Sequence, residues 1–137
     1  MSSATHGDGR GLLDTSVVID HDGIDPTALP EESTISAITL AELAAGPSAT
    51  DDLIERSRRQ DRLQWAASRW DPLPFDADAA RAFGQVAALT RAAGRKRVSR
   101  LADLQIAAVA IANGIALYTR NGKDIRHLDE IVRIIDL

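Results

Sequence analysis

Four acidic residues of this chain stand where a carboxylate could do chemistry. Asp14 and Asp124 follow short apolar runs that give way to polar residues, which places them just past the ends of predicted strands. Glu42 and Asp103 are each the only charged residue in an otherwise apolar helical stretch. Such a lone carboxylate costs free energy unless it is solvated, paired or coordinating a cation. In a parallel sheet all four side chains can converge on one crevice, because the strands end at a shared edge.

The chemistry that suits such a group of acids is divalent metal binding. Crowded carboxylates repel one another, so some would have to bind protons unless a cation neutralises them. The chain has no cysteine and only three scattered histidines, so oxygen ligands favour Mg²⁺ or Mn²⁺ over zinc. Mg²⁺ keeps several waters and binds one or two carboxylates directly, which leaves room for a substrate phosphate. Two such ions about 4 Å apart can activate a water and stabilise the leaving oxygen of a phosphodiester.

Hydroxyl and basic side chains extend the candidate site. Thr15 and Ser16 directly follow Asp14 and could add a hydroxyl to a ligand or to the scissile phosphate. Five cations without an intervening acid lie within residues 91–100, and they are Arg91, Arg95, Lys96, Arg97 and Arg100. The net charge is −4, yet a concentrated basic stretch in an acidic protein can bind a phosphate backbone. A basic stretch of this kind can also be only a solvated face.

Each acid has a structural interpretation as well. Asp14 can cap a helix, which taken alone is the commoner use of such a residue. Glu42 can extend its side chain to solvent. Asp103 lies in the first turn of its helix, where the helix dipole and free N–H groups stabilise an anion. The functional interpretation rests on the four acids occurring together.

The elements that would position these residues alternate between strands and helices. One strand runs through Leu12 and Leu13 to Asp14, and β-branched or apolar runs predict further strands at 33–36, 115–119 and 131–135. Helical spacing and capping residues predict helices at 37–45, from 53 to about 70, from 76 or 78 to near 94, and at 101–112. This order predicts an α/β fold with a parallel sheet of four to five strands and helices on its faces.

Length and composition predict one compact domain. The chain has 137 residues, of which 45% are hydrophobic, which suits a single sizeable core. We expect a polar N-terminal tail at 1–10 and one domain at 11–137. No apolar run approaches the about 18 residues of a membrane span, and the polar N-terminus has no signal-peptide core. We therefore expect a soluble, cytoplasmic protein that does not bind a membrane.

Four motifs, in this order, carry a resemblance to a known family. They are Leu13-Asp14-Thr15-Ser16, then Thr39-Leu40-Ala41-Glu42-Leu43, then Ala102-Asp103-Leu104-Gln105-Ile106-Ala107-Ala108, then Tyr118-Thr119-Arg120-Asn121-Gly122-Lys123-Asp124. In order and spacing the chain resembles the PIN-domain nucleases, above all the VapC-type toxins of bacterial toxin–antitoxin modules. The resemblance extends from Leu12 to Asp124, which is nearly the whole chain. It implies a three-layer α/β/α fold around the parallel sheet.

The resemblance also implies an activity, a cofactor and partners. It implies a Mg²⁺- or Mn²⁺-dependent endoribonuclease whose acidic site is Asp14, Glu42 and Asp103, with Asp14 and Asp103 as the metal ligands. The expected partners are a second copy of the chain and a VapB-type antitoxin whose tail enters the active groove. The expected substrate is structured cellular RNA, such as transfer or ribosomal RNA, whose cleavage stops translation. In this reading the basic residues that contact RNA are Arg95, Lys96, Arg97 and Arg100.

One position departs from the strict four-acid pattern of that family. Asn121 stands where some relatives carry Asp, and Asp124 follows three residues later. Asn121 can coordinate through its carbonyl or orient a water, but it brings no charge. We therefore assign Asp124 as the fourth acid, with Thr119 and Asn121 as supporting residues.

Three other functions fit less of the sequence. A receiver-like phosphoacceptor domain would need an acidic pair after the first strand and an Asp after a central strand, whereas Asp14 is unpaired and the second strand ends in Ser36. A dinucleotide-binding enzyme would need a G-x-G-x-x-G after a strand, which the chain lacks. A catalytically inactive PIN-like module that binds RNA or protein remains open, although the set of Asp14, Glu42 and Asp103 argues against it.

Overall fold

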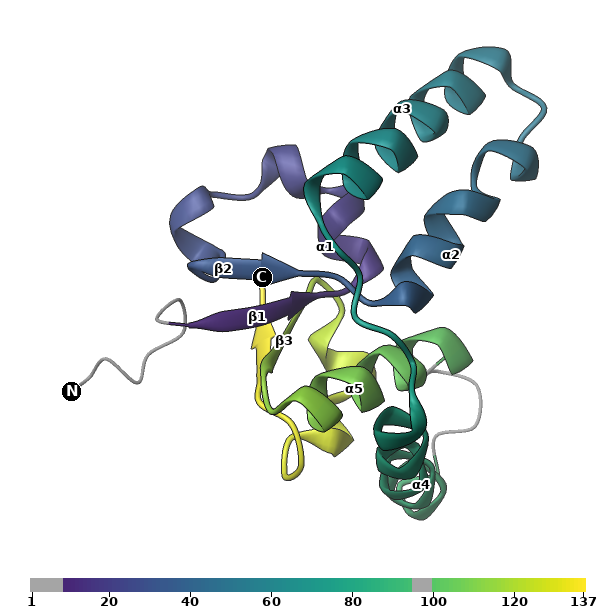
Figure 1. The fold of residues 1–137 in the computed structure, drawn as a ribbon. Helices are drawn as coiled ribbons and strands as arrows, with labels where there is room; N and C mark the ends of the chain where they lie inside the picture. Colours follow the sequence, from purple (N-terminus) through teal and green to yellow (C-terminus); the bar gives the residue numbers. More distant parts are fainter. Residues whose placement is uncertain (1–8, 95–99) are drawn as a thin grey trace.

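A four-stranded parallel sheet forms the centre of the protein (Figure 1). The structure, a computed structural model, describes residues 9–94 and 100–137. Within these residues the strands lie in the order β2-β1-β3-β4. Their bounds are β1 Arg10–Leu13, β2 Glu32–Thr34, β3 Ala116–Thr119 and β4 Ile134–Asp136. The predicted parallel α/β fold is confirmed.

The two middle strands supply residues to both faces of the sheet. Successive side chains of a strand point to opposite faces. Leu12 of β1 and Leu117 of β3 are paired in register and belong to one buried cluster, while Leu13 and Tyr118, the next pair, belong to the other. All four are buried, as expected for a parallel sheet that is covered on both sides.

Helices cover both faces and complete the three layers (Figure 1). Their bounds are α1 Thr15–Ile19, α2 Ala37–Ala45, α3 Leu53–Arg69, α4 Ala77–Ala92 and α5 Leu101–Asn113. Helices α4 and α5 contribute to the cluster of Leu12 and Leu117, while α1, α2 and α3 contribute to that of Leu13 and Tyr118. Short 3₁₀ turns lie at His21–Gly23, Pro26–Ala28, Pro47–Ala49, Gly122–Asp124 and Arg126–Leu128. Among the described residues, no helix combines the length and apolar character that a membrane crossing requires.

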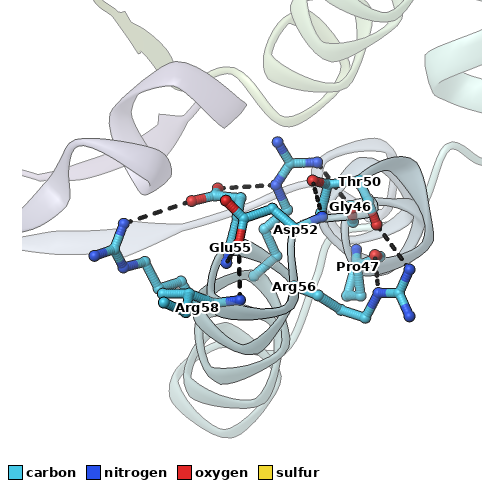
Figure 2. Close-up of polar contacts among 9 residues, drawn as sticks. Gly46, Pro47, Thr50, Asp52, Glu55, Arg56 and Arg58 are labelled. Atoms are coloured by element: carbon cyan, nitrogen blue, oxygen red, sulfur yellow. Dashed lines mark hydrogen bonds and ion pairs between the residues drawn. The ribbon is translucent and has the colours of Figure 1, made fainter.

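Helices α2 and α3 lie side by side and project from the sheet as an arm (Figure 1). Polar contacts hold its tip, as Figure 2 shows. Arg56 donates to the carbonyls of Pro47 at 3.2 Å and Thr50 at 2.8 Å. Asp52 caps α3 by accepting from the backbone N–H groups of Ile54 and Glu55. These contacts satisfy backbone groups that helix ends leave unpaired, so they stabilise the turn between the two helices.

The structure differs from the predicted bounds at each strand. Arg10, which was predicted to lie in the N-terminal tail, begins β1, and β3 begins at Ala116 rather than at residue 115. The larger differences are at β2 and β4. β2 ends at Thr34 rather than at residue 36, because Ser36 instead caps α2 by accepting from the backbone N–H of Thr39 at 3.1 Å. β4 begins at Ile134 rather than at residue 131. The reason is that Ile131 and Val132 both donate backbone hydrogen bonds to the carbonyl of Leu128, which bends the chain before it reaches the sheet.

Candidate active site

Asp14 lies directly after β1 and begins α1. Its backbone N–H donates to the carbonyl of Tyr118 on β3 at 3.0 Å. Its Oδ1 accepts from the backbone N–H of Val17 at 3.1 Å and from the Ser16 hydroxyl at 2.6 Å. Asp14 therefore does cap α1, as its structural interpretation predicts. The cap also fixes a carboxylate, only 8% exposed, at the carboxyl edge of the two central strands.

The environment of Asp14 disfavours its negative charge. Burial raises the pKa of its carboxyl group above the usual value, and the charge of Asp103 raises it further. Hydrogen bonds from Ser16, Thr119 and the backbone of Val17 offset part of this effect. A carboxylate that is both desolvated and close to a second carboxylate is stabilised when a cation binds.

Two hydroxyls join Asp14 to the loop that follows β3. The Thr119 side chain hydrogen-bonds to Asp14 and accepts from the backbone N–H of Asn121 at 3.0 Å. The Ser16 hydroxyl, which contacts Asp14, accepts from the backbone N–H of Arg120 at 3.1 Å. The structure therefore brings Ser16 and Thr119, two predicted supporting residues, onto the predicted metal ligand.

Glu42 on α2 is held by Thr15, the first residue of α1. The Thr15 hydroxyl lies 2.5 Å from Oε1 of Glu42 and 3.0 Å from the hydroxyl of the buried Thr39. A hydroxyl has one proton to donate, so Thr15 can donate to the carboxylate while it accepts from Thr39. The Glu42 side chain is 27% exposed. It is therefore anchored at the site rather than extended freely into solvent.

Asp103 and Glu42 share one cationic neighbour. Asp103 lies in the first turn of α5, and its side chain is 25% exposed. The guanidinium of Arg100 lies 3.6 Å from Oδ2 of Asp103 and 3.7 Å from Oε2 of Glu42. Arg100 was predicted only as a contact for RNA, and the sequence contains no signal that it would face these two acids.

The loop after β3 holds the remaining predicted residues. Asp124 is half-buried in the 3₁₀ turn Gly122–Asp124, and its place as the fourth acid stays a prediction. Asn121 is exposed, with its backbone tied to Thr119. Asp136 at the end of β4, which sequence reasoning missed, accepts from the backbone N–H of Gly122 at 3.2 Å. The signal available in the sequence was an acid directly after the strand predicted at 131–135.

The described acids do not close into a tight cluster. Asp14 is coupled to Asp103 by charge, and Asp103 to Glu42 through Arg100. Even so, within residues 9–94 and 100–137 no three acidic or histidine side chains lie close enough to hold a metal ion among them. A pair of carboxylates with hydroxyl neighbours still fits Mg²⁺ or Mn²⁺, because Mg²⁺ keeps most of its waters. The oxygen donors and the raised pKa of Asp14 agree with such an ion.

A pocket opens beside these residues. It has a volume of about 350 Å³, and Thr15, Glu42 and Arg100 lie in its wall. A second pocket of about 360 Å³ runs along α1 and α3 and shares Ile19 and Arg62 with the first. The two pockets therefore adjoin each other between α1 and the arm. The predicted RNA contacts Arg95, Lys96 and Arg97 fall outside the described residues.

Comparison with known proteins agrees with this geometry. Residues 11–131 match the PIN domain family. Ribonuclease VapC8 of Mycobacterium tuberculosis is 39% identical over 103 residues, which cover 74% of this chain and 91% of the relative. Ribonuclease VapC5 of the same organism is 34% identical over 134 residues, which cover 90% and 95%.

Solved structures resemble the protein over nearly its whole length. The crystal structure of VapBC-5, a toxin–antitoxin system of M. tuberculosis, matches with a TM-score of 0.84 at 34% identity, covering 94% of this chain and 99% of that one. DNA-bound VapBC of Salmonella typhimurium matches with a TM-score of 0.75 at 27% identity, covering 93% and 98%. These matches leave no room for the receiver-like or dinucleotide-binding alternatives. The chain belongs to the PIN domain family, among the relatives named VapC.

Proposed function

We propose that the protein is a ribonuclease toxin of a toxin–antitoxin module and that it cleaves RNA internally with the help of Mg²⁺ or Mn²⁺. The observation that carries the proposal lies at the carboxyl edge of β1 and β3, where the charge of Asp103 acts on Asp14 and Arg100 links Asp103 to Glu42. A pocket lined by Thr15, Glu42 and Arg100 opens beside them. The relatives named ribonuclease VapC8 and VapC5 support the choice of RNA as substrate.

We assign a separate role to each side chain of the site. Asp14 and Asp103 would hold the divalent cation, which would neutralise their charges and supply Lewis-acid polarisation of the scissile phosphodiester. The Oε1 atom of Glu42 accepts a hydrogen bond from the Thr15 hydroxyl. Its Oε2 atom can orient the attacking water once Arg100 has moved away from it. Ser16 and Thr119 keep Asp14 in place by their hydrogen bonds. Asp124 completes the acidic set, and Arg95, Lys96, Arg97 and Arg100 bind the RNA backbone.

We propose two protein partners, a VapB-type antitoxin and a second copy of this chain. The solved relatives named VapBC are toxin–antitoxin complexes, which supports the antitoxin. The adjoining pockets between α1 and the arm offer a path for an antitoxin segment, since Ile19 at their junction is an exposed apolar residue. We expect the substrate to be structured RNA in the cytoplasm, such as transfer or ribosomal RNA, whose cleavage would stop translation.

The experiment that tests the activity is an incubation of antitoxin-free protein with total bacterial RNA. Parallel samples contain Mn²⁺, Mn²⁺ with excess chelator, and Mn²⁺ with the Asp103→Asn variant. Discrete fragments that require both Mn²⁺ and Asp103 would support the proposal, and their ends would identify the cut site. Intact RNA in every sample, with Mn²⁺ binding shown separately by calorimetry, would favour an inactive PIN-like binding module instead.

A further inference from the structure

Arg100 contacts two carboxylates of the site at once. Its Nη2 atom lies 3.7 Å from Oε2 of Glu42, and its Nε atom lies 3.6 Å from Oδ2 of Asp103. Glu42 comes from α2 and Asp103 from α5, so one guanidinium joins two helices at the mouth of the site. The charges of Glu42 and of the proposed metal ligand Asp103 are thus already neutralised in part by a residue of the chain.

The contact is loose. Both distances exceed those of good hydrogen bonds, and the Arg100 side chain is 68% exposed. Exposed ion pairs of this kind contribute little to stability and are readily exchanged. The Arg100 side chain also makes no capping hydrogen bond at the start of α5. It can therefore leave the two carboxylates without disturbing the helix that carries Asp103.

We infer that Arg100 is an exchangeable counterion of the acidic site, which leaves Glu42 and Asp103 when a divalent cation binds and then pairs with a phosphate of the RNA. This inference rests on the proposed ribonuclease function. The guanidinium and the cation compete for the same carboxylate environment, and the divalent ion brings twice the charge. Arg100 shares a pocket wall with Thr15 and Glu42, so the released side chain stays beside the substrate. A guanidinium matches a phosphate through paired hydrogen bonds.

The inference makes the contribution of Arg100 to RNA binding conditional. Without a divalent cation the guanidinium stays with Glu42 and Asp103 and adds little attraction for RNA. With the cation bound it is released and adds one phosphate contact. An arginine that belonged only to a solvated basic face would attract RNA equally in both conditions.

The first test measures Mn²⁺ affinity by calorimetry, with no RNA present. Arg100→Gln removes the competing charge, and we expect it to tighten Mn²⁺ binding about fivefold. Arg100→Lys keeps a charge but loses the planar fork, so its affinity should fall between that of Arg100→Gln and wild type. Arg81→Gln is the matched control, because Arg81 is 72% exposed and pairs with Asp78 three residues away on α4. It should leave the Mn²⁺ affinity unchanged.

The second test measures the affinity for bulk transfer RNA in two conditions, with a chelator and with Ca²⁺ as the divalent cation. Each sample is checked on a gel for intact RNA. In Ca²⁺, Arg100→Gln should weaken RNA binding about fivefold. It should also reduce the slope of log affinity against log salt concentration by about one. In chelator, Arg100→Gln and wild type should bind alike. If Arg100→Gln lost RNA affinity equally in both conditions, the proposal that Arg100 exchanges the two carboxylates for a phosphate would be overturned.

The two proposals fail in different ways. If wild type cleaves RNA with Mn²⁺ but Arg100→Gln leaves Mn²⁺ affinity at the wild-type value, the counterion role is overturned and the nuclease stands. If Arg100→Gln tightens Mn²⁺ binding but wild type cleaves no RNA, the counterion role stands and the nuclease is overturned. Circular dichroism of each variant confirms that the compared proteins are folded.

Discussion

The Thr15 hydroxyl lies 2.5 Å from Oε1 of Glu42, a residue 27 positions further along the chain. Thr15 follows the end of β1, and Glu42 lies in the middle of α2. The bond therefore ties the carboxylate on α2 to the first residue of α1, the helix that Asp14 caps. The bond between Thr15 and Glu42 therefore holds Glu42 near Asp14, the residue directly before Thr15.

Thr15→Val should lower activity while keeping the fold. Valine matches the shape of threonine but cannot hold the Glu42 carboxylate, and loss of such an outer contact typically costs about tenfold in activity or metal affinity. Initial rates on an RNA fragment that the wild type cleaves would measure the loss. Thr15→Ser keeps the hydroxyl and should retain most of the activity. Equal rates for Thr15→Val and wild type would show that the hydroxyl does not position Glu42.

Asp14→Asn should abolish cleavage and yet stabilise the metal-free protein at neutral pH. The native state holds the Asp14 proton more tightly than the unfolded chain does, because burial raises the pKa of this carboxyl group above 3.8. Stability is therefore lost as the pH rises from the unfolded pKa through the folded one. Asparagine carries no charge and can still accept the hydrogen bonds from Val17 and Ser16.

Thermal unfolding, measured over a range of pH in the presence of a chelator, checks the direction of this change in stability. The melting temperature of Asp14→Asn should exceed that of wild type at pH 7, and the gap should close below about pH 4, where Asp14 is protonated in both states. A wild type that is more stable than Asp14→Asn at pH 7 without metal would contradict the expectation. Asp25→Asn is a useful comparison, because hydrogen bonds from Thr27 lower the pKa of Asp25 and should give the opposite trend.

Mn²⁺ should raise the melting temperature of the folded protein. An ion that binds only the native state adds about 2.7 kcal/mol at a concentration one hundred times its Kd. Asp103→Asn removes one of the two proposed ligands, so it should reduce this rise more than Asp136→Asn, which removes an acid that faces Gly122 instead. Differential scanning fluorimetry across a Mn²⁺ titration measures the shifts. No shift for wild type at millimolar Mn²⁺ would count against a carboxylate metal site.

Gly11→Ala should destabilise the sheet on which the site is built. A Cβ at Gly11 would collide with Cε1 of the buried Tyr118 ring and would lie 2.8 Å from Cδ1 of that ring and 2.9 Å from Cβ of Pro30. Overpacking of this kind costs about 1–3 kcal/mol, which denaturant unfolding would measure. Gly84→Ala in α4 is the control, because a Cβ there meets nothing within 4 Å. It should stabilise the protein by about 0.5–1 kcal/mol, so a similar loss for both variants would rule out a specific clash.

Much of the fold was predictable because its signals are local. The apolar runs that became β1 and β3, the caps at Ser36 and Asp76, and the left-handed Gly114 after α5 all depend on neighbours in the chain. The predicted start of β4 was wrong, because an apolar run does not reveal that the backbone N–H groups of Ile131 and Val132 donate to the carbonyl of Leu128. A side chain buried in a turn and one buried in a strand look alike in sequence.

The sequence by itself determined which acids are candidates for the proposed chemistry, because acids on apolar elements and at strand ends are visible one position at a time. Only the tertiary structure decided how they face one another. It joined Thr15 to Glu42, tied Ser16 and Thr119 to Asp14, and put Arg100 between Glu42 and Asp103. Most of these contacts link residues far apart in the chain, and their geometry depends on how whole helices pack on the sheet. No pattern of neighbouring residues contains that information.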